Sequence, residues 1–63
     1  MNAKKFKRHN YEVQYRHKRR SWHFGGDHDT LELAHKHAAT LSPYWDEVRI
    51  LTYTNRITNI TKV

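Results

Sequence analysis

Histidine is the residue with the widest chemical range in this chain, and six histidines occur within 63 residues. Imidazoles bind transition metals and transfer protons, so their spacing decides which chemistry is available. His35 and His37 are two apart in a predicted helix and point about 200° from each other, so they cannot hold one ion together. His23, Asp27 and His28 lie around a glycine pair, but nothing in the sequence fixes their geometry. We therefore predict no metal site.

Other catalytic patterns are also missing from the sequence. The segment 25–29, Gly-Gly-Asp-His-Asp, precedes a predicted helix but lacks the Gly-Lys-Ser/Thr of a phosphate loop, and its acids would repel a phosphate. Ser21 and Ser42 have no surrounding motif that marks a nucleophile. Asp46 and Glu47 are adjacent, so in a strand their side chains point to opposite faces. We predict no enzyme activity and no cofactor.

Positive charge is the strongest functional signal. The net charge is +6, and residues 1–20 contain eight Lys or Arg side chains against the single acid Glu12. Such a one-sided field attracts nucleic acid or an anionic membrane. Phe6 offers too little apolar surface to anchor this segment in a membrane, so nucleic acid is the favoured partner.

The composition indicates one small cytoplasmic domain. A chain of 63 residues supports a single domain with a thin core. It contains no cysteine, which fits a reducing compartment. No stretch is apolar enough for a membrane span or a signal peptide. We predict a mobile basic arm over residues 1–9 and one domain over residues 10–63.

The first two predicted strands form a hairpin. Residues 10–17 alternate aromatic or β-branched side chains with polar ones, which is typical of a half-buried strand. Residues 18–21 then turn the chain in a loose loop. In the second strand we expect Trp22 and Phe24 to face the core and His23 to face away, and the glycine pair that follows to end the strand.

A helix and a third strand follow. Asp29 is the predicted N-cap, with Glu32 completing a capping box. The core stripe of the helix consists of Leu31, Ala34, Ala38 and Leu41, and Ser42-Pro43 ends it. Residues 47–54 alternate as a strand, with Val48, Ile50 and Thr52 on one face and Arg49, Leu51 and Tyr53 on the other. Residues 57–63 fit either a short fourth strand or a tail.

These elements predict an α+β fold with the order β-β-α-β and a C-terminal fourth strand left open. One antiparallel sheet, with strands in the order 2-1-3, carries a single helix on one face. The other face stays uncovered. Its predicted residues are Glu12, Gln14, Arg16, His23, Arg49, Leu51 and Tyr53.

The pattern of core positions resembles small uncharacterised bacteriophage proteins. It consists of Tyr11-x-Val13-x-Tyr15, Trp22, the alanine-bearing helix through Leu41, and Val48-Arg49-Ile50. The resemblance covers residues 10–53 and lends no binding residue. It implies a protein that binds a host protein or nucleic acid.

We predict a non-enzymatic protein that binds DNA or RNA through the phosphate backbone, with little sequence preference. The predicted contacts are Lys4, Lys5, Lys7, Arg8, Arg16, Lys18, Arg19 and Arg20, with Arg49 and Tyr53 on the open sheet face. The alternative is a small phage-type inhibitor or adaptor that binds a host protein with an acidic surface. Its anchors would be Tyr44, Trp45, Leu51 and Tyr53. An exposed edge strand also suits a homodimer.

Overall fold

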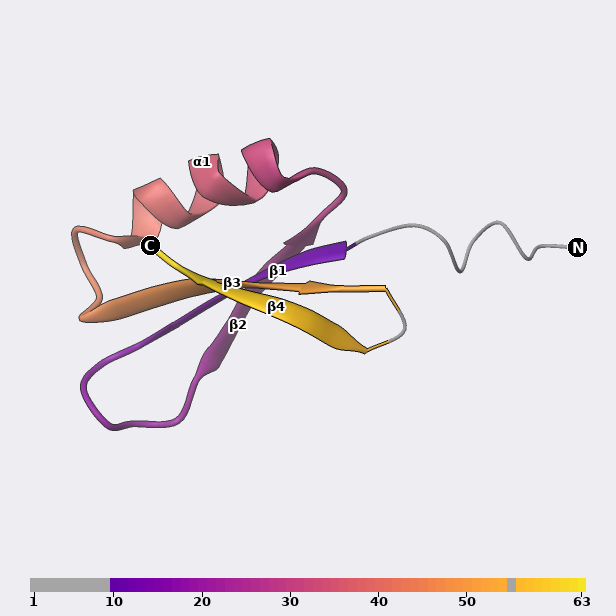
Figure 1. The fold of residues 1–63 in the computed structure, drawn as a ribbon. Helices are drawn as coiled ribbons and strands as arrows, with labels where there is room; N and C mark the ends of the chain where they lie inside the picture. Colours follow the sequence, from indigo (N-terminus) through magenta and orange to yellow (C-terminus); the bar gives the residue numbers. More distant parts are fainter. Residues whose placement is uncertain (1–9, 55) are drawn as a thin grey trace, which may run out of the picture.

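The computed structural model describes residues 10–54 and 56–63, which form one antiparallel sheet with a helix packed on it (Figure 1). The elements are β1 (Asn10–Arg16), β2 (His23–His28), α1 (Leu31–Leu41), β3 (Glu47–Tyr53) and β4 (Ile57–Lys62). The strand order is β2-β1-β3-β4. The predicted α+β fold and the order of the first three strands are confirmed, and the C-terminal segment is a strand. The predicted arm over residues 1–9 lies outside the described residues.

A thin core lies between α1 and the sheet. Its buried side chains are Val13, Ala34, Ala38, Val48 and Ile50, and Tyr11, Tyr15, Leu41 and Trp45 pack around them. The two alanines let the helix approach the sheet closely, so that Val13 and Ile50 are completely shielded from water. Each of these two side chains contributes about 1.5–3 kcal/mol by its burial.

The ends of α1 have a clear local cause. The Thr30 hydroxyl accepts a hydrogen bond from the Leu33 backbone N–H at 3.1 Å, so Thr30 is the N-cap. The prediction that Asp29 caps the helix is wrong by one residue. At the other end α1 stops at Leu41, as predicted, but the predicted reason is wrong. Ser42, the residue before Pro43, keeps helical dihedrals and donates its N–H to the Ala38 carbonyl oxygen at 2.9 Å. The helix cannot continue because Pro43 has no backbone N–H to donate.

A β-bulge in β2 changes which residues reach the core. Val13 pairs with Gly26 and Gln14 pairs with Phe24, so Gly25 is the extra residue. The prediction that the glycine pair ends the strand is wrong, since β2 continues to His28. A Cβ atom at residue 25 would lie 3.0 Å from the Val13 carbonyl oxygen, so the close approach of the two strands favours glycine there.

The extra residue reverses the predicted facing of the side chains before it. A shift of one residue in the register moves the side chains on one side of the shift to the other face of the sheet. His23 now lies opposite Tyr15 and contacts its ring, while Phe24 lies opposite Gln14 and is 62% exposed. The predictions that Trp22 and Phe24 are core residues and that His23 faces away are therefore wrong.

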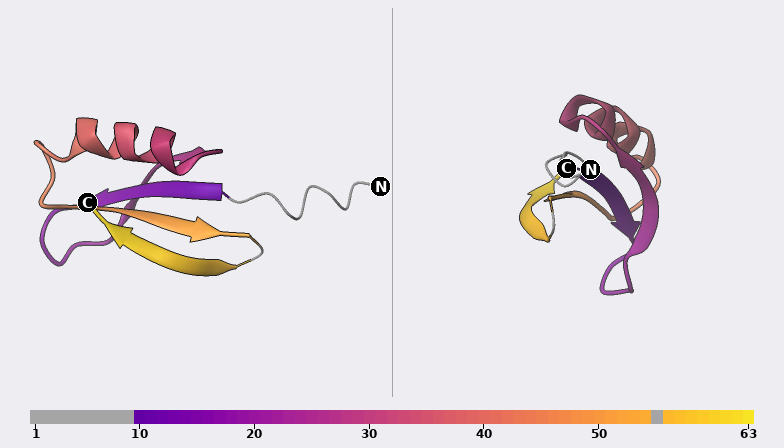
Figure 2. Two further views of the ribbon diagram at one scale, coloured as in Figure 1. Left: turned by 45° about the horizontal axis from the view of Figure 1, so that its top comes forward. Right: turned by 90° about the vertical axis from the view of Figure 1, so that its right-hand side faces the viewer.

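Strand β4 extends the sheet beyond the helix. Within the described residues α1 contacts β1, β2 and β3 but not β4, and both views in Figure 2 place β4 away from the helix. Ile57 and Ile60 on this strand are about half exposed. No helix in the described part of the chain is long and apolar enough to cross a membrane.

Candidate nucleic-acid interface

The loop between β1 and β2 presents a cluster of cations. His17 to Arg20 are all exposed, and the Arg20 N–H donates to the His17 carbonyl oxygen at 3.0 Å to close a tight turn. Arg19 takes the left-handed conformation with φ of 58°. In the described part of the chain, the side chains of Lys18, Arg19 and Arg20 form no ion pair. Three cationic side chains are thus available to an anionic ligand.

The backbone of this loop is held by neighbouring side chains. The Lys18 N–H donates to the Asp46 carboxylate at 2.9 Å, and His17 Nδ1 lies 3.5 Å from the same carboxylate. The hydrogen bond from Lys18 is the main reason that the pKa of the Asp46 carboxyl lies below its usual range. Arg16 also donates to the Arg20 carbonyl oxygen at 3.3 Å. These contacts fix the loop through its backbone and leave its cationic side chains unused.

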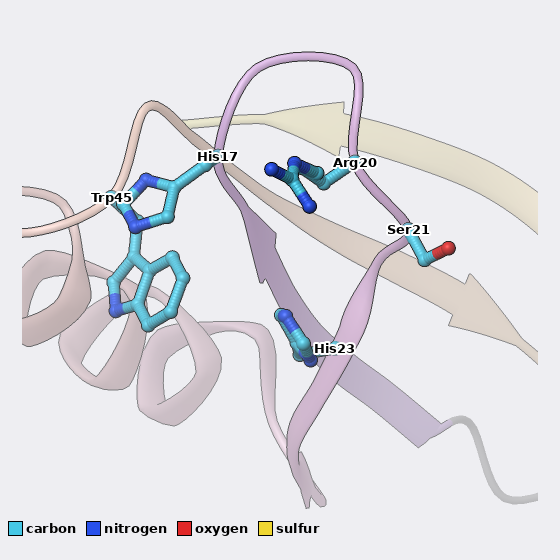
Figure 3. A pocket seen from close by; sticks show the side chains of 5 residues that line it. All are labelled: His17, Arg20, Ser21, His23 and Trp45. Carbon is cyan, nitrogen blue, oxygen red and sulfur yellow. The ribbon is translucent and has the colours of Figure 1, made fainter.

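An aromatic pocket opens next to the cationic loop. His17, Arg20, Ser21, His23 and Trp45 line an open volume of about 520 Å³ (Figure 3). The His17 ring stacks on Trp45 with ring centres 4.3 Å apart and planes 27° apart. His23 lies 5.7 Å from the same indole. The pocket therefore combines flat rings with a guanidinium.

Tyr15 supports this pocket from the core. Its ring centre lies 4.4 Å from that of Trp45 and 5.3 Å from that of His23. Tyr15 and Trp45 also pack against the buried core residues. The indole is thereby fixed to the core on one side while it lines the pocket on the other.

The open face of the sheet carries a connected polar network. Arg16 forms an ion pair with Glu47, with its NH2 atom 2.8 Å from the carboxylate oxygen. Arg49 Nε donates to the Gln14 side-chain oxygen at 2.8 Å. The Trp22 ring contacts both guanidinium groups, whose central carbons are 4.2 Å and 3.9 Å from its centre. Both arginines are thus partnered within the protein.

The network continues to Tyr53. Gln14 donates its amide N–H to Glu12 at 2.8 Å, and the Tyr53 hydroxyl donates to the other oxygen of that carboxylate at 2.7 Å. This hydrogen bond, together with burial, raises the pKa of Tyr53 to about 12. At the other end, partial burial and then the nearby Arg16 charge lower the pKa of the Arg49 guanidinium. The carboxylates of Glu12 and Glu47 balance the two arginines, so this face has little net charge.

The structure separates the predicted contact residues into three groups. The four cations of the arm, Lys4, Lys5, Lys7 and Arg8, lie outside the described residues. Lys18, Arg19 and Arg20 are exposed together in the loop. Arg16, Arg49 and Tyr53 lie on the open face as predicted, but each is bonded to a neighbouring side chain.

The sequence did not predict that His17, His23 and Trp45 meet in one pocket. His17 continues the alternation that places Tyr15 on the helix side of the sheet, and this signal could have identified it. His23 reaches the same side only because of the bulge. Trp45, predicted only as an anchor for a protein partner, lies between α1 and β3, where no periodicity indicates its neighbours.

One further polar pair joins β2 to α1. His28 Nε2 and His37 Nδ1 are 2.9 Å apart, so one imidazole donates a hydrogen bond to the other. No group of three or more His, Cys, Asp or Glu residues suited to a metal ion occurs in residues 10–54 and 56–63. The pair ties the end of β2 to the helix.

Comparisons of the chain with protein-family models, curated proteins and solved structures found no match. The resemblance to bacteriophage proteins stays a prediction.

Proposed function

We propose that this protein is a non-enzymatic, cytoplasmic nucleic-acid-binding protein that contacts the phosphate backbone mainly through the loop between β1 and β2. The observation that carries the proposal is the exposure of Lys18, Arg19 and Arg20, none of which forms an ion pair in the described part of the chain. Unpaired cations can neutralise phosphates and release the counterions condensed on a nucleic acid. The predicted arm contacts, Lys4, Lys5, Lys7 and Arg8, would extend the same field.

Sequence preference in this proposal is weak. Helix α1 carries Glu32 and Lys36 as its only charged residues, which makes it a poor reader of base edges in a major groove. On the sheet face, Arg16 and Arg49 would have to leave Glu47 and Gln14 before they could bind phosphates. The binding energy therefore comes from phosphate contacts, which position a nucleic acid without reading its sequence.

The test compares two triple variants with equal loss of charge. The loop variant changes Lys18, Arg19 and Arg20 to Ala. The control changes Lys36, Arg56 and Lys62 to Ala, which lie on α1, before β4 and on β4. Fluorescence anisotropy with labelled single-stranded DNA, duplex DNA and RNA would be measured over a series of salt concentrations.

The slope of log K against log salt is negative. We expect the loop variant to reduce its magnitude by about 2–3, because each lost phosphate contact removes about 0.7–0.9. The control should keep a slope nearer to that of the original chain. Equal losses in both variants would mean that the charge acts generically, and the loop would then not be the binding site.

A second candidate function is binding to a host protein as a phage-type inhibitor or adaptor. Its supporting observation is the exposure of the apolar side chains of Ile57 and Ile60 on the edge strand β4. The predicted anchor Leu51 is only 5% exposed and cannot contact a partner extensively. Such binding would resist salt and would be abolished by Ile60→Asp, whereas nucleic-acid binding would survive that change.

A further inference from the structure

We propose that the pocket formed by His17, Arg20, Ser21, His23 and Trp45 receives one unpaired nucleobase, so that the protein binds single-stranded nucleic acid in preference to duplex. This inference rests on the proposed function and adds the form of nucleic acid that the site selects. The pocket and the cationic loop are parts of one surface, because His17 and Arg20 belong to both.

The pocket has the chemical features of a base-stacking site. Its open volume of about 520 Å³ falls in the usual range for small-molecule sites. Figure 3 shows His17 beside Trp45 at one side of the opening, with Arg20 and His23 at the other. Unpaired bases stack on aromatic rings and on guanidinium planes, and both kinds of surface are present here.

The aromatic wall is fixed before a ligand arrives. Trp45 packs against Tyr15 at 4.4 Å between ring centres and belongs to the shell of the core. His17, which stacks on Trp45, is held in turn by Asp46, whose carboxylate contacts the His17 ring and the Lys18 backbone N–H. A preformed surface lowers the entropy lost on binding, which favours a ligand that is itself flat and rigid.

The nearby charges suit a nucleotide rather than a neutral aromatic ligand. A base enters the pocket with its own sugar and phosphates attached, so these phosphates must lie close to the pocket mouth. Lys18 and Arg19 lie between His17 and Arg20 in the sequence and are exposed. Asp46, the acid bonded to His17, does not itself line the pocket.

This geometry discriminates between strands. In a duplex each base is paired and stacked, and it would have to be flipped out before it could enter the pocket, at a cost in free energy. A single strand offers unpaired bases at a much smaller cost. The cations serve both forms, so the preference arises from the pocket alone.

The experiment uses the two tryptophans of the chain. Trp22→Phe leaves Trp45 as the only tryptophan and keeps an aromatic ring next to Arg16 and Arg49. The full chain with the Trp22→Phe substitution would be titrated with twelve-nucleotide oligothymidine, twelve-nucleotide oligouridine and a twelve-base-pair duplex. Binding is followed by anisotropy and, independently, by Trp45 emission. Single strands should change the Trp45 emission as they saturate the protein, and the duplex should leave it nearly unchanged.

Matched variants then measure the contribution of the ring. Trp45→Leu keeps apolar volume without an aromatic face, and Tyr44→Ala is the control, since Tyr44 is 76% exposed and does not line the pocket. Loss of one base-stacking contact should weaken single-strand binding by about 5- to 150-fold. Duplex affinity should change by less than about 2-fold, because the loop cations remain. If circular dichroism shows that Trp45→Leu is unfolded, His23→Ala replaces it, with the emission readout retained.

The outcomes separate the two proposals. Single-strand binding that leaves Trp45 emission unchanged would overturn the pocket inference and leave the proposed function standing. Equal affinity for single strand and duplex would also overturn it. Absence of binding to every nucleic acid at physiological salt would refute both.

Discussion

The contact of Trp22 with two guanidinium groups gives the most direct test of how the open face is held together. Cation–π contacts join the ring to Arg16 at 4.2 Å and to Arg49 at 3.9 Å. Trp22→Leu removes the aromatic face and keeps much of the apolar contact, whereas Trp22→Ala removes both. The difference between the two variants therefore separates the aromatic contribution from simple burial.

The magnitude follows from the geometry. Each cation–π contact is worth about 0.5–1 kcal/mol at an exposed site, so the two together contribute about 1–2 kcal/mol. A half-buried indole removes on the order of 100 Å² from water, which adds about 2.5 kcal/mol at 25 cal/mol per Å². We expect a loss of about 2 kcal/mol for Trp22→Leu and about 3.5–4.5 kcal/mol for Trp22→Ala.

The assay is thermal and urea unfolding followed by the circular dichroism of α1, which does not depend on tryptophan emission. For a domain of this size, 1 kcal/mol shifts Tm by about 4–8 °C, so Trp22→Leu should lower Tm by about 8–16 °C. Tyr44→Leu serves as the control, because an exposed side chain away from the core should alter stability by less than about 0.5 kcal/mol.

A double-mutant cycle with Arg49→Met would isolate the pair. A coupling energy of about 0.5–1 kcal/mol between Trp22 and Arg49 is expected. If Trp22→Leu is as stable as the original chain to within 0.5 kcal/mol and the coupling is zero, the cation–π reasoning is refuted.

Two further perturbations address single groups. Because the neutral form of Tyr53 is stabilised by its bond to Glu12, its contribution to stability is complete below pH 10 and is lost as the pH rises through about 12. Absorbance at 295 nm should show a late tyrosine step near pH 12 that Tyr53→Phe removes; an unchanged titration in that variant would contradict the assignment. Gly26 has φ of 149°, and a Cβ atom there would lie 3.2 Å from the His37 ring. Gly26→Ala should therefore lower stability by about 1–2 kcal/mol in urea unfolding, and a neutral effect would show that the bulge adapts.

Much of the fold could be predicted because hydrophobic periodicity survives in three of the five elements. In β1 and β3 every second residue faces the helix, and the observed register places Val13 opposite Ile50 as this alternation requires. In α1 the predicted stripe holds for Ala34, Ala38 and Leu41, but the prediction that Leu31 belongs to it is wrong, since Leu31 is 40% exposed. Periodicity does not identify β4 as a strand, because it has no buried face and its residues are exposed or nearly so.

The second strand could not be read by periodicity, because one extra residue inverts the pattern. Glycine inside a strand is a known sign of a bulge, and Gly25-Gly26 carried that sign. The sequence alone does not show, however, whether the residues before or after the glycines keep the predicted orientation of their side chains. Pairing with β1 decides it: Tyr11 opposite His28 fixes the later residues, so the earlier ones reverse.

The reversal also explains where the positive charge is available. Because Trp22 lies outside the core, its ring contacts Arg16 and Arg49, which the pairing of β1 with β3 places beside Glu47 and Gln14. The same reversal moves His23 to the helix side, where it joins Trp45 at the pocket. One inserted glycine thus adds an aromatic contact to the two partnered arginines of the sheet face and an imidazole beside the cationic loop. In the described part of the chain, exposed and unpaired positive charge next to flat rings is then concentrated at the loop, which is why the binding proposal rests on the loop and not on the sheet.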